Sequence, residues 1–289
     1  MEIRNVGVVG CGQMGSGIAL VCAQSGYRVT VSEINDALLQ KGLDSIDATL
    51  SRSVAKGRLS PQDQTAILNC IRGTTSLKDF SSCDLVIEAV AEDLVLKQQL
   101  MAELDAICPK DTILASNTSC LSIKALAQAT THPDRVLGLH FFNPVTSMRL
   151  AEIVTTPQTS AETLKTARQF IASLGKQPVL AQDSPGFIVN HLMVPFLLNA
   201  IRLLESGMAT REDIDTAITL GLNHPLGPLA LADLIGLDIV LSMGNSLYWA
   251  LKDPQYAAPA LLKEMVSRGW LGRKSGKGFY DYDTPVLRK

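Results

Sequence analysis

Short apolar runs alternate with longer segments of helical periodicity up to about residue 182 of the chain. The apolar runs predict strands at 3–10, 27–33, 71–76, 84–90, 112–117, 135–140, 149–156 and 176–182. The segments between them predict helices at 13–26, 35–56, 60–68, 95–108 and 160–175. Alternation at these lengths predicts an α/β fold of the Rossmann type, with a doubly wound, mostly parallel sheet.

The pattern changes near Pro185, and no convincing strand follows it. Residues 187–207 are apolar nearly all round, which is typical of a helix at the centre of a helical domain or in a subunit interface. Helical patterns follow at 211–222, 227–249 and 259–269. We therefore expect two domains, a sheet domain over residues 1–183 and an all-α domain over residues 184–289.

Composition narrows the class of protein. Hydrophobic residues make up 46% of the 289 residues, enough to bury a sizeable core. The net charge of −2 argues against a nucleic-acid binder. The chain has no apolar run of roughly eighteen residues and no signal-peptide layout, so we expect no membrane association. Six cysteines without a C-x-x-C pair or a zinc-ligand spacing predict reduced thiols in a cytoplasmic protein, and no metal site.

A G-x-G-x-x-G pattern joins the first predicted strand to the first predicted helix. Gly10 permits the tight turn, Gly12 lets the backbone approach a pyrophosphate, and Gly15 lets helix and strand pack closely. The helix N-terminus offers unpaired N–H groups to phosphate. This pattern alone is a weak signal, and a methyltransferase is the main alternative, but its position between strand and helix favours a dinucleotide site.

An acid completes this pattern at the end of the second predicted strand. Glu33 can accept hydrogen bonds from the adenosine ribose and repel a 2′-phosphate. The next residues, Ile34 and Asn35, offer no cation for that phosphate. The expected cofactor is therefore NAD rather than NADP.

Polar residues end several predicted strands, where dinucleotide folds bind their ligands. The segment "SNTS" (116–119) ends one strand, and His140 ends the next. A lone histidine on an apolar strand is more often structural than catalytic. Glu152, however, lies among apolar residues in the following strand, and a buried carboxylate needs a partner or a proton. We therefore expect Glu152 to pair with His140 and to orient it as a general base.

The chain resembles the L-3-hydroxyacyl-CoA dehydrogenase family, the NAD-dependent enzymes of fatty-acid β-oxidation and butanoate metabolism. The matching segments are "GVVGCGQMGSGIA", "DLVIEAVAEDLVLK", "ASNTSCLSI", "GLHFFNPV", "DSPGFIVNHL", "NHPLGPLALADLIGLD" and "GKGFYDY". They cover nearly the whole chain in the family's order. "HFFNP" together with "SNTS" and "PGFIVN" is a specific combination.

The resemblance assigns roles by motif. It implies His140 as the catalytic base, Glu152 as its partner, and Ser119 and Asn190 as residues that contact the substrate in a site drawing on both domains. The implied cofactor residues are Gly10, Gly12, Gln13, Met14, Gly15, Glu33, Ala89, Glu92, Lys97, Asn117 and Lys274. Without the resemblance, Ser119 is better explained as the cap of a helix beginning near Leu121, Asn190 as a polar residue of an interface helix, and Glu92 and Lys97 as surface charges.

A basic cluster near the end of the second predicted helix suggests the substrate. Arg52 and Lys56 share one helix face, and Arg58 follows. On sequence alone a solvated basic face is the better explanation, but the resemblance implies that Lys56 binds the CoA moiety of an acyl-CoA. The expected activity is reversible oxidation of a 3-hydroxyacyl-CoA such as 3-hydroxybutyryl-CoA.

Two alternatives remain open. One is a sugar-acid dehydrogenase of the same fold, resembling L-gulonate dehydrogenase. The other is a non-catalytic NAD-binding relative like the crystallins of this architecture. For the hydroxyacyl-CoA dehydrogenase, the apolar C-terminal helices are expected to form a homodimer interface.

Overall fold

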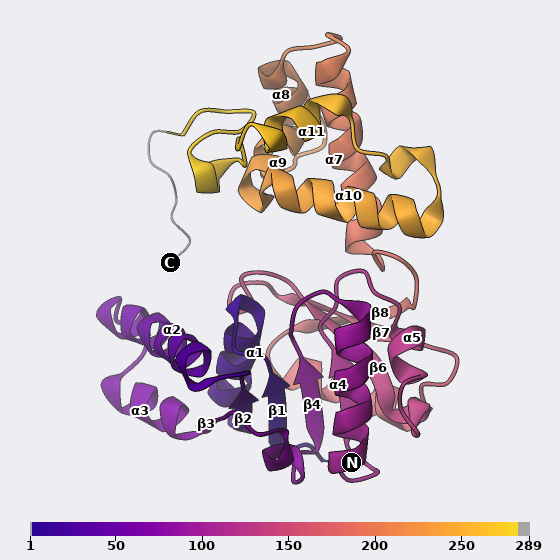
Figure 1. The fold of residues 1–289 in the computed structure, drawn as a ribbon. Coiled ribbons are helices and arrows are strands. Elements are labelled where there is room, and N and C mark those ends of the chain that lie inside the picture. The colour runs from indigo at the N-terminus through magenta and orange to yellow at the C-terminus, as the bar shows by residue number, and fades with distance from the viewer. Residues whose placement is uncertain (1, 283–289) are drawn as a thin grey trace. The chain divides into compact units, whose positions relative to one another are not determined.

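The computed structural model describes residues 2–282, which divide between Ser184 and Pro185 into two compact units (Figure 1). The first unit is built on an eight-stranded sheet with the order β3-β2-β1-β4-β5-β6-β7-β8. The strands are β1 (Asn5–Val9), β2 (Arg28–Ser32), β3 (Ile71–Thr74), β4 (Leu85–Glu88), β5 (Ile113–Ser116), β6 (Val136–Phe141), β7 (Leu150–Thr155) and β8 (Gln177–Gln182). This is a doubly wound order, and the direction of winding reverses between β1 and β4.

All neighbouring strands pair in parallel except β6 and β7, which are antiparallel. The prediction of a mostly parallel sheet is therefore confirmed. Strands β4, β5 and β6 are buried along their whole length. Helices cover both faces of such a sheet, so its strands carry continuous apolar sequence rather than an alternating pattern.

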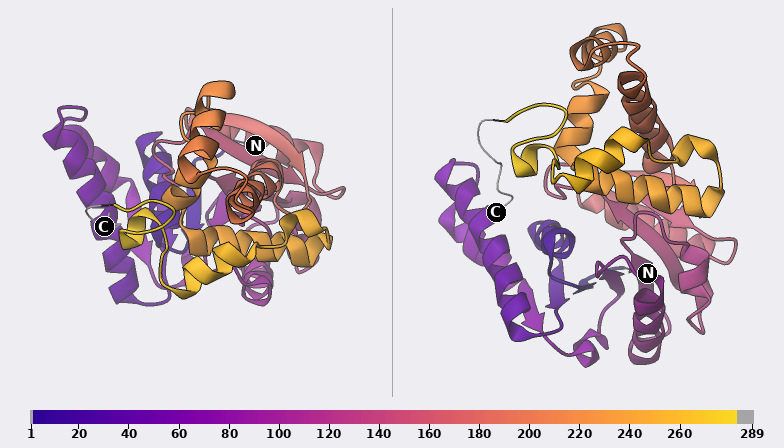
Figure 2. Two further views of the ribbon diagram at one scale, coloured as in Figure 1. Left: turned by 90° about the horizontal axis from the view of Figure 1, so that it is seen from above. Right: turned by 45° about the horizontal axis from the view of Figure 1, so that its top comes forward.

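Helices lie on both sides of the sheet (Figures 1 and 2). Helices α1, α2 and α3 pack together on one part of it, α4 packs against α5, and α6 packs against β7 and β8. Their bounds are α1 (Gln13–Gln24), α2 (Asp36–Ala55), α3 (Pro61–Asn69), α4 (Leu94–Ile107), α5 (Ile123–Ala127) and α6 (Ala161–Ser173), with short 3-10 turns η1 (Leu77–Phe80) and η2 (Pro133–Arg135). The sheet and α1, α2 and α6 share one hydrophobic core.

The second unit is helical. It comprises α7 (Val189–Glu205), α8 (Arg211–Gly221), α9 (Pro228–Ile235), α10 (Leu237–Leu251), η3 (Pro254–Tyr256), α11 (Ala260–Ser267) and η4 (Arg273–Ser275). Helix α7 packs against α8, α9, α10 and α11, so the nearly all-apolar segment is the central helix of this unit. Between residues 185 and 282 the only β-type pairings are isolated bridges at Lys277.

Two details differ from the sequence prediction. The pattern over 227–249 forms two helices, α9 and α10, bent by 97° at Gly236, which has a φ of 108° that few other residues adopt. Helix α5 begins at Ile123 and not near Leu121, and its N-cap is Ser122, whose side chain accepts from the Ala125 N–H. Ser119 therefore does not cap this helix.

No single helix within residues 2–282 has both the length and the hydropathy to cross a membrane. The bent pair α9–α10 passes that test only when its two parts are counted together.

Candidate functional site

The glycine turn between β1 and α1 has room on its outer side. Gly10 adopts a φ of 95°, and a Cβ on Gly15 would lie 1.8 Å from the Gly10 carbonyl oxygen. The protein itself therefore requires glycine at both positions. A Cβ on Gly12 would meet no atom within 4 Å. Gly12 is also the N-cap of α1 and gives no side-chain cap, so the N–H groups of the first turn have no cap from this residue and suit an anion.

Glu33 lies beside this turn. Its Oε1 accepts a hydrogen bond from the Cys11 N–H at 2.9 Å, and its Oε2 accepts one from the Ile34 N–H at 3.0 Å. These donors orient the carboxylate at the end of β2, next to the glycine turn. Gln13 and Met14 begin α1, with Gln13 exposed and Met14 half-buried, and Ala89 follows β4 beside β1. Glu33, Ala89 and the first residues of α1, all predicted to bind the cofactor, thus lie near the glycine turn.

His140 and Glu152 face each other across the antiparallel pair β6–β7, where they occupy the same register position. His140 Nδ1 lies 2.7 Å from Glu152 Oε2. His140 is 4% exposed and Glu152 is fully buried. The predicted contact therefore exists in a site nearly closed to water, where a carboxylate fixes the imidazole tautomer with the proton on Nδ1 and the lone pair on Nε2.

The neighbours of His140 hold its ring and its strand. The Phe142 ring contacts the imidazole in a tilted arrangement, with centroids 4.4 Å apart and an interplanar angle of 49°. Phe141 does not share this role, because successive side chains of a strand point to opposite faces and its ring lies in the hydrophobic core. Asn117 instead accepts the Phe141 N–H at 2.9 Å through its side chain. Asn117 thereby ties the end of β5 to the strand that carries His140.

The side chain of Glu92, in the loop between β4 and α4, holds the "SNTS" segment at the end of β5. Glu92 Oε1 accepts hydrogen bonds from the Thr118 hydroxyl at 2.5 Å and from the Ser119 N–H at 2.9 Å. Burial favours a higher pKa for the Glu92 carboxyl, but the nearby Lys97 ammonium and these two donors outweigh it and lower the pKa. Glu92 is therefore an ionised anchor for the backbone of Ser119.

Lys97 is not the surface charge that its sequence context suggests. It lies on α4 with 1% exposure, and its Nζ contacts both carboxylate oxygens of Glu88 at 2.9 and 2.8 Å. Periodicity placed it on a helix but did not show that this turn of α4 packs over the end of β4. Glu88 was not predicted as a site residue. A carboxylate inside the apolar run "DLVIEAV" is the same signal that pointed to Glu152, so it was available in the sequence.

Two predicted residues belong to the helical unit. Asn190 is the second residue of α7 and is 8% exposed. Lys274, in η4, forms an ion pair with Asp238 in the first turn of α10. The structure thus describes the surroundings of both residues within the helical unit.

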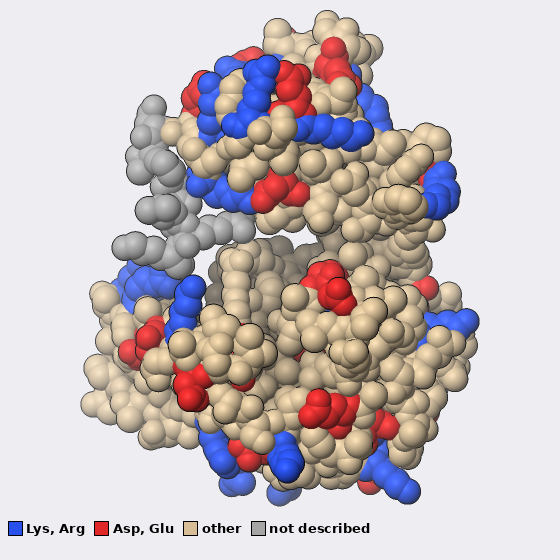
Figure 3. Space-filling view, in the orientation of Figure 1, with Lys and Arg blue, Asp and Glu red and all other residues tan. Residues whose placement is uncertain are grey.

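The basic cluster lies at the end of α2. Arg52 is in the last turn and, among residues 2–282, donates to the Ala48 carbonyl and the Thr49 hydroxyl of its own helix. Lys56 is the C-cap residue, and both it and Arg58 are exposed. Lys and Arg side chains gather over this end of α2 in Figure 3. The cluster is thus accessible to a charged ligand.

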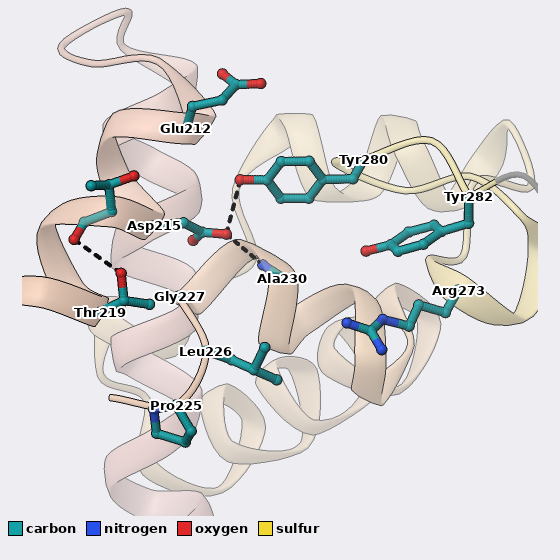
Figure 4. Close-up of a pocket in the computed structure, with 11 residues that line it drawn as sticks. Glu212, Asp215, Thr219, Pro225, Leu226, Gly227, Ala230, Arg273, Tyr280 and Tyr282 are labelled. Carbon is teal, nitrogen blue, oxygen red and sulfur yellow. Dashed lines mark hydrogen bonds between the residues drawn. The ribbon is translucent and has the colours of Figure 1, made fainter. Parts of the chain in front are cut away.

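The helical unit has a hollow of about 460 Å³ beside α8 (Figure 4). Asp215, in its wall, accepts the Leu229 and Ala230 N–H groups and the Tyr280 hydroxyl. Nearby, Asp233 accepts two backbone N–H groups of the C-terminal segment and the Tyr282 hydroxyl. Burial raises the pKa of Asp233, and these donors offset it only in part. The acids here fasten the segment up to Tyr282 to α8 and α9.

A Rossmann-type sheet with this glycine turn and acid is typical of dinucleotide-dependent oxidoreductases. The chain belongs to the 3-hydroxyacyl-CoA dehydrogenase family. The model described as "3-hydroxyacyl-CoA dehydrogenase, NAD binding domain" matches residues 5–184, and that described as "3-hydroxyacyl-CoA dehydrogenase, C-terminal domain" matches residues 186–282. The family establishes NAD as the cofactor.

Relatives match over nearly their whole length. The chain is 48% identical over 282 residues to a 3-hydroxybutyryl-CoA dehydrogenase of Mycobacterium tuberculosis, covering 97% of this chain and 99% of that protein. The crystal structure of M. tuberculosis FadB2 is similar with a TM-score of 0.94 at 47% identity, covering 98% and 100% of the two chains. That of (S)-3-hydroxybutyryl-CoA dehydrogenase PaaH1 from Ralstonia eutropha has a TM-score of 0.93 at 43% identity, with coverage of 98% and 100%.

Proposed function

We propose that this chain oxidises L-3-hydroxyacyl-CoA thioesters, such as 3-hydroxybutyryl-CoA, to 3-ketoacyl-CoA with NAD, and that the reaction is reversible. Family membership supports the reaction and the cofactor. The observation that carries the mechanism is the buried contact of 2.7 Å between His140 Nδ1 and Glu152 Oε2. A base held in this way lies at the ligand-binding edge of the sheet, where a substrate alcohol must lose its proton.

In this mechanism Nε2 of His140 takes the proton of the 3-hydroxyl group. Glu152 keeps the proton on Nδ1 and stabilises the imidazolium that forms. When bound, NAD supplies the acceptor for the hydride that leaves the same carbon. Ser119 hydrogen-bonds the substrate oxygen, and Asn190 of the helical unit contributes to the same site. Phe142 shields the imidazole from water.

The cofactor residues divide into two groups. Gly10, Gly12 and Gly15 shape the pyrophosphate turn with Gln13 and Met14, and Glu33 accepts the ribose hydroxyls. Ala89, Glu92, Lys97, Asn117 and Lys274 are the other residues proposed to bind the cofactor. The open space at Gly12 is the feature of the fold that supports this assignment.

Arg52 and Lys56 are proposed to hold the phosphates of CoA, supported by their exposure at one end of α2. The unit up to Ser184 is proposed to bind NAD, and the helical unit to complete the substrate site and to form a homodimer. Large apolar side chains exposed on the helical unit support the dimer: Leu192, Met208, Leu220, Leu222 and Trp249. Sedimentation at equilibrium tests it, and a monomer at all concentrations would contradict it.

A cytoplasmic location is part of the proposal. All six cysteines are free thiols and four are buried. Burial raises the pKa of Cys83 to about 12, which keeps it protonated and unreactive. Such thiols are expected in a reducing compartment.

The deciding experiment follows NADH absorbance with 3-hydroxybutyryl-CoA and, separately, with L-gulonate. We expect turnover of the thioester only. Turnover of gulonate alone would favour the sugar-acid alternative. NAD binding without turnover of either would favour a non-catalytic relative.

A further inference from the structure

Glu88 is a buried acid that the mechanism above does not use. It is the last residue of β4 and is fully buried. Its carboxylate accepts both close contacts of the Lys97 ammonium, the Ser116 hydroxyl, and the Val90 N–H at 3.2 Å. A carboxylate with so many donors is fixed in place by the fold.

Lys97 connects Glu88 to a second acid. Besides the two Glu88 oxygens, its Nζ lies 3.3 Å from the Val90 carbonyl oxygen and 3.3 Å from Glu92 Oε2. The ammonium is almost fully buried. Glu88 is the closer of its two carboxylates, so it sets where the cation sits. When one partner of a buried ion pair is removed, the remaining charge is expected to move toward the nearest group of opposite charge.

Glu92 connects Lys97 to the "SNTS" loop. Its other oxygen, Oε1, accepts the Thr118 hydroxyl and the Ser119 N–H. A continuous chain of charged hydrogen bonds therefore runs from Glu88 through Lys97 and Glu92 to Ser119. Each link is 3.3 Å or shorter.

We propose that Glu88 is a positioning residue that sets the place of Ser119 by holding the Lys97 ammonium where it contacts Glu92 at 3.3 Å without drawing Glu92 inward. Without the Glu88 charge, the Lys97 ammonium has Glu92 as its one remaining carboxylate. It then draws Glu92 toward the interior and away from Thr118 and Ser119. This inference rests on the proposed function, because Ser119 is taken there to bind the substrate oxygen.

The test compares Glu88→Gln with Asp105→Asn. Asp105 forms the buried ion pair with Arg135 elsewhere in the same unit and touches none of the residues in the chain from Glu88 to Ser119. It therefore reports the general cost of weakening a buried ion pair. Both variants are assayed well below their melting temperatures for KM and kcat with 3-hydroxybutyryl-CoA. Amide hydrogen exchange of the 116–122 segment is followed in the cofactor-free protein.

Glu88→Gln is expected to raise KM by about tenfold and to accelerate exchange of the Ser119 amide, because its charge-assisted hydrogen bond to Glu92 is lost. Asp105→Asn is expected to change neither. Equal effects of the two variants, or no effect of Glu88→Gln on both readouts, would overturn the proposal. If Glu88→Gln does not fold, Glu88→Asp decides the question, because the shorter side chain keeps the charge but draws the carboxylate back from the Lys97 ammonium. A raised KM and faster exchange then support the proposal, and unchanged values overturn it.

An inactive parent enzyme would contradict the proposed function instead. In that case the exchange data still decide whether Glu88 orders the loop, because they need neither substrate nor cofactor.

Discussion

Replacing Glu152 by Gln removes the charge that faces His140 while keeping the size of the side chain. With Nδ1 and Oε2 at 2.7 Å, the charges of an imidazolium and the carboxylate are about 4 Å apart, and they attract by about 4 kcal/mol at an effective dielectric constant of about 20. The amide oxygen of the introduced Gln can still accept the Nδ1–H hydrogen bond, which recovers part of this energy. We therefore expect kcat to fall about a hundred- to a thousandfold.

The assay is the initial rate of NADH formation at saturating 3-hydroxybutyryl-CoA and NAD. NADH affinity, measured by its fluorescence, should change by less than about threefold, because Glu152 is fully buried beneath His140 and does not face the cofactor turn. Glu103→Gln, an exposed position on α4, is the matched control. A Glu152→Gln enzyme with kcat near that of the parent would refute the role of the carboxylate.

Four other substitutions test the remaining parts of the site and the fold. His140→Gln should lower kcat/KM by about a hundred- to ten-thousandfold with NADH affinity nearly intact; full activity would exclude it as the base. Glu33→Ala should weaken NAD binding and relax discrimination against NADP in titrations with both cofactors; an unchanged preference would remove Glu33 from recognition. Gly12→Ala should leave the melting temperature unchanged but weaken NADH binding, because the added methyl group meets only the open space; unchanged binding would place the pyrophosphate elsewhere. Burial favours a higher pKa for Asp105, but donors from Thr131 and Arg135 lower it from 3.8 to about 2, so the stability it contributes is present above pH 3.8 and lost as the pH falls toward 2. Asp105→Asn should therefore flatten the pH dependence of urea unfolding over that range, and a parallel curve would contradict this.

The elements of the fold could be predicted because their signals are local. Apolar runs and caps fixed the strands and most helices to within a few residues, and the acid in β7 pointed to His140. The bend at Gly236 was missed because the helical pattern continues across it and only the backbone angle breaks it.

Other features depend on contacts between distant segments. The burial of Lys97 follows from the packing of α4 over the end of β4, and no periodicity in α4 reveals it. The anchoring of Ser119 by Glu92 joins residues from two loops. Neither the burial of Lys97 nor the anchoring of Ser119 could be predicted from the neighbouring residues in the sequence.

The pairing of His140 with Glu152 depends on the register of β6 and β7 rather than on the loop between them. Val145 packs in the core and the Lys176 ammonium donates to the Val145 and Met148 carbonyls, so changes in loop length that leave the pair in place are confined to the exposed residues Thr146 and Ser147. A single residue inserted in β7 before Glu152 would instead turn its side chain to the other face of the sheet. Protein engineers can vary the loop, and with it the approach to the imidazole, while leaving the strand lengths untouched.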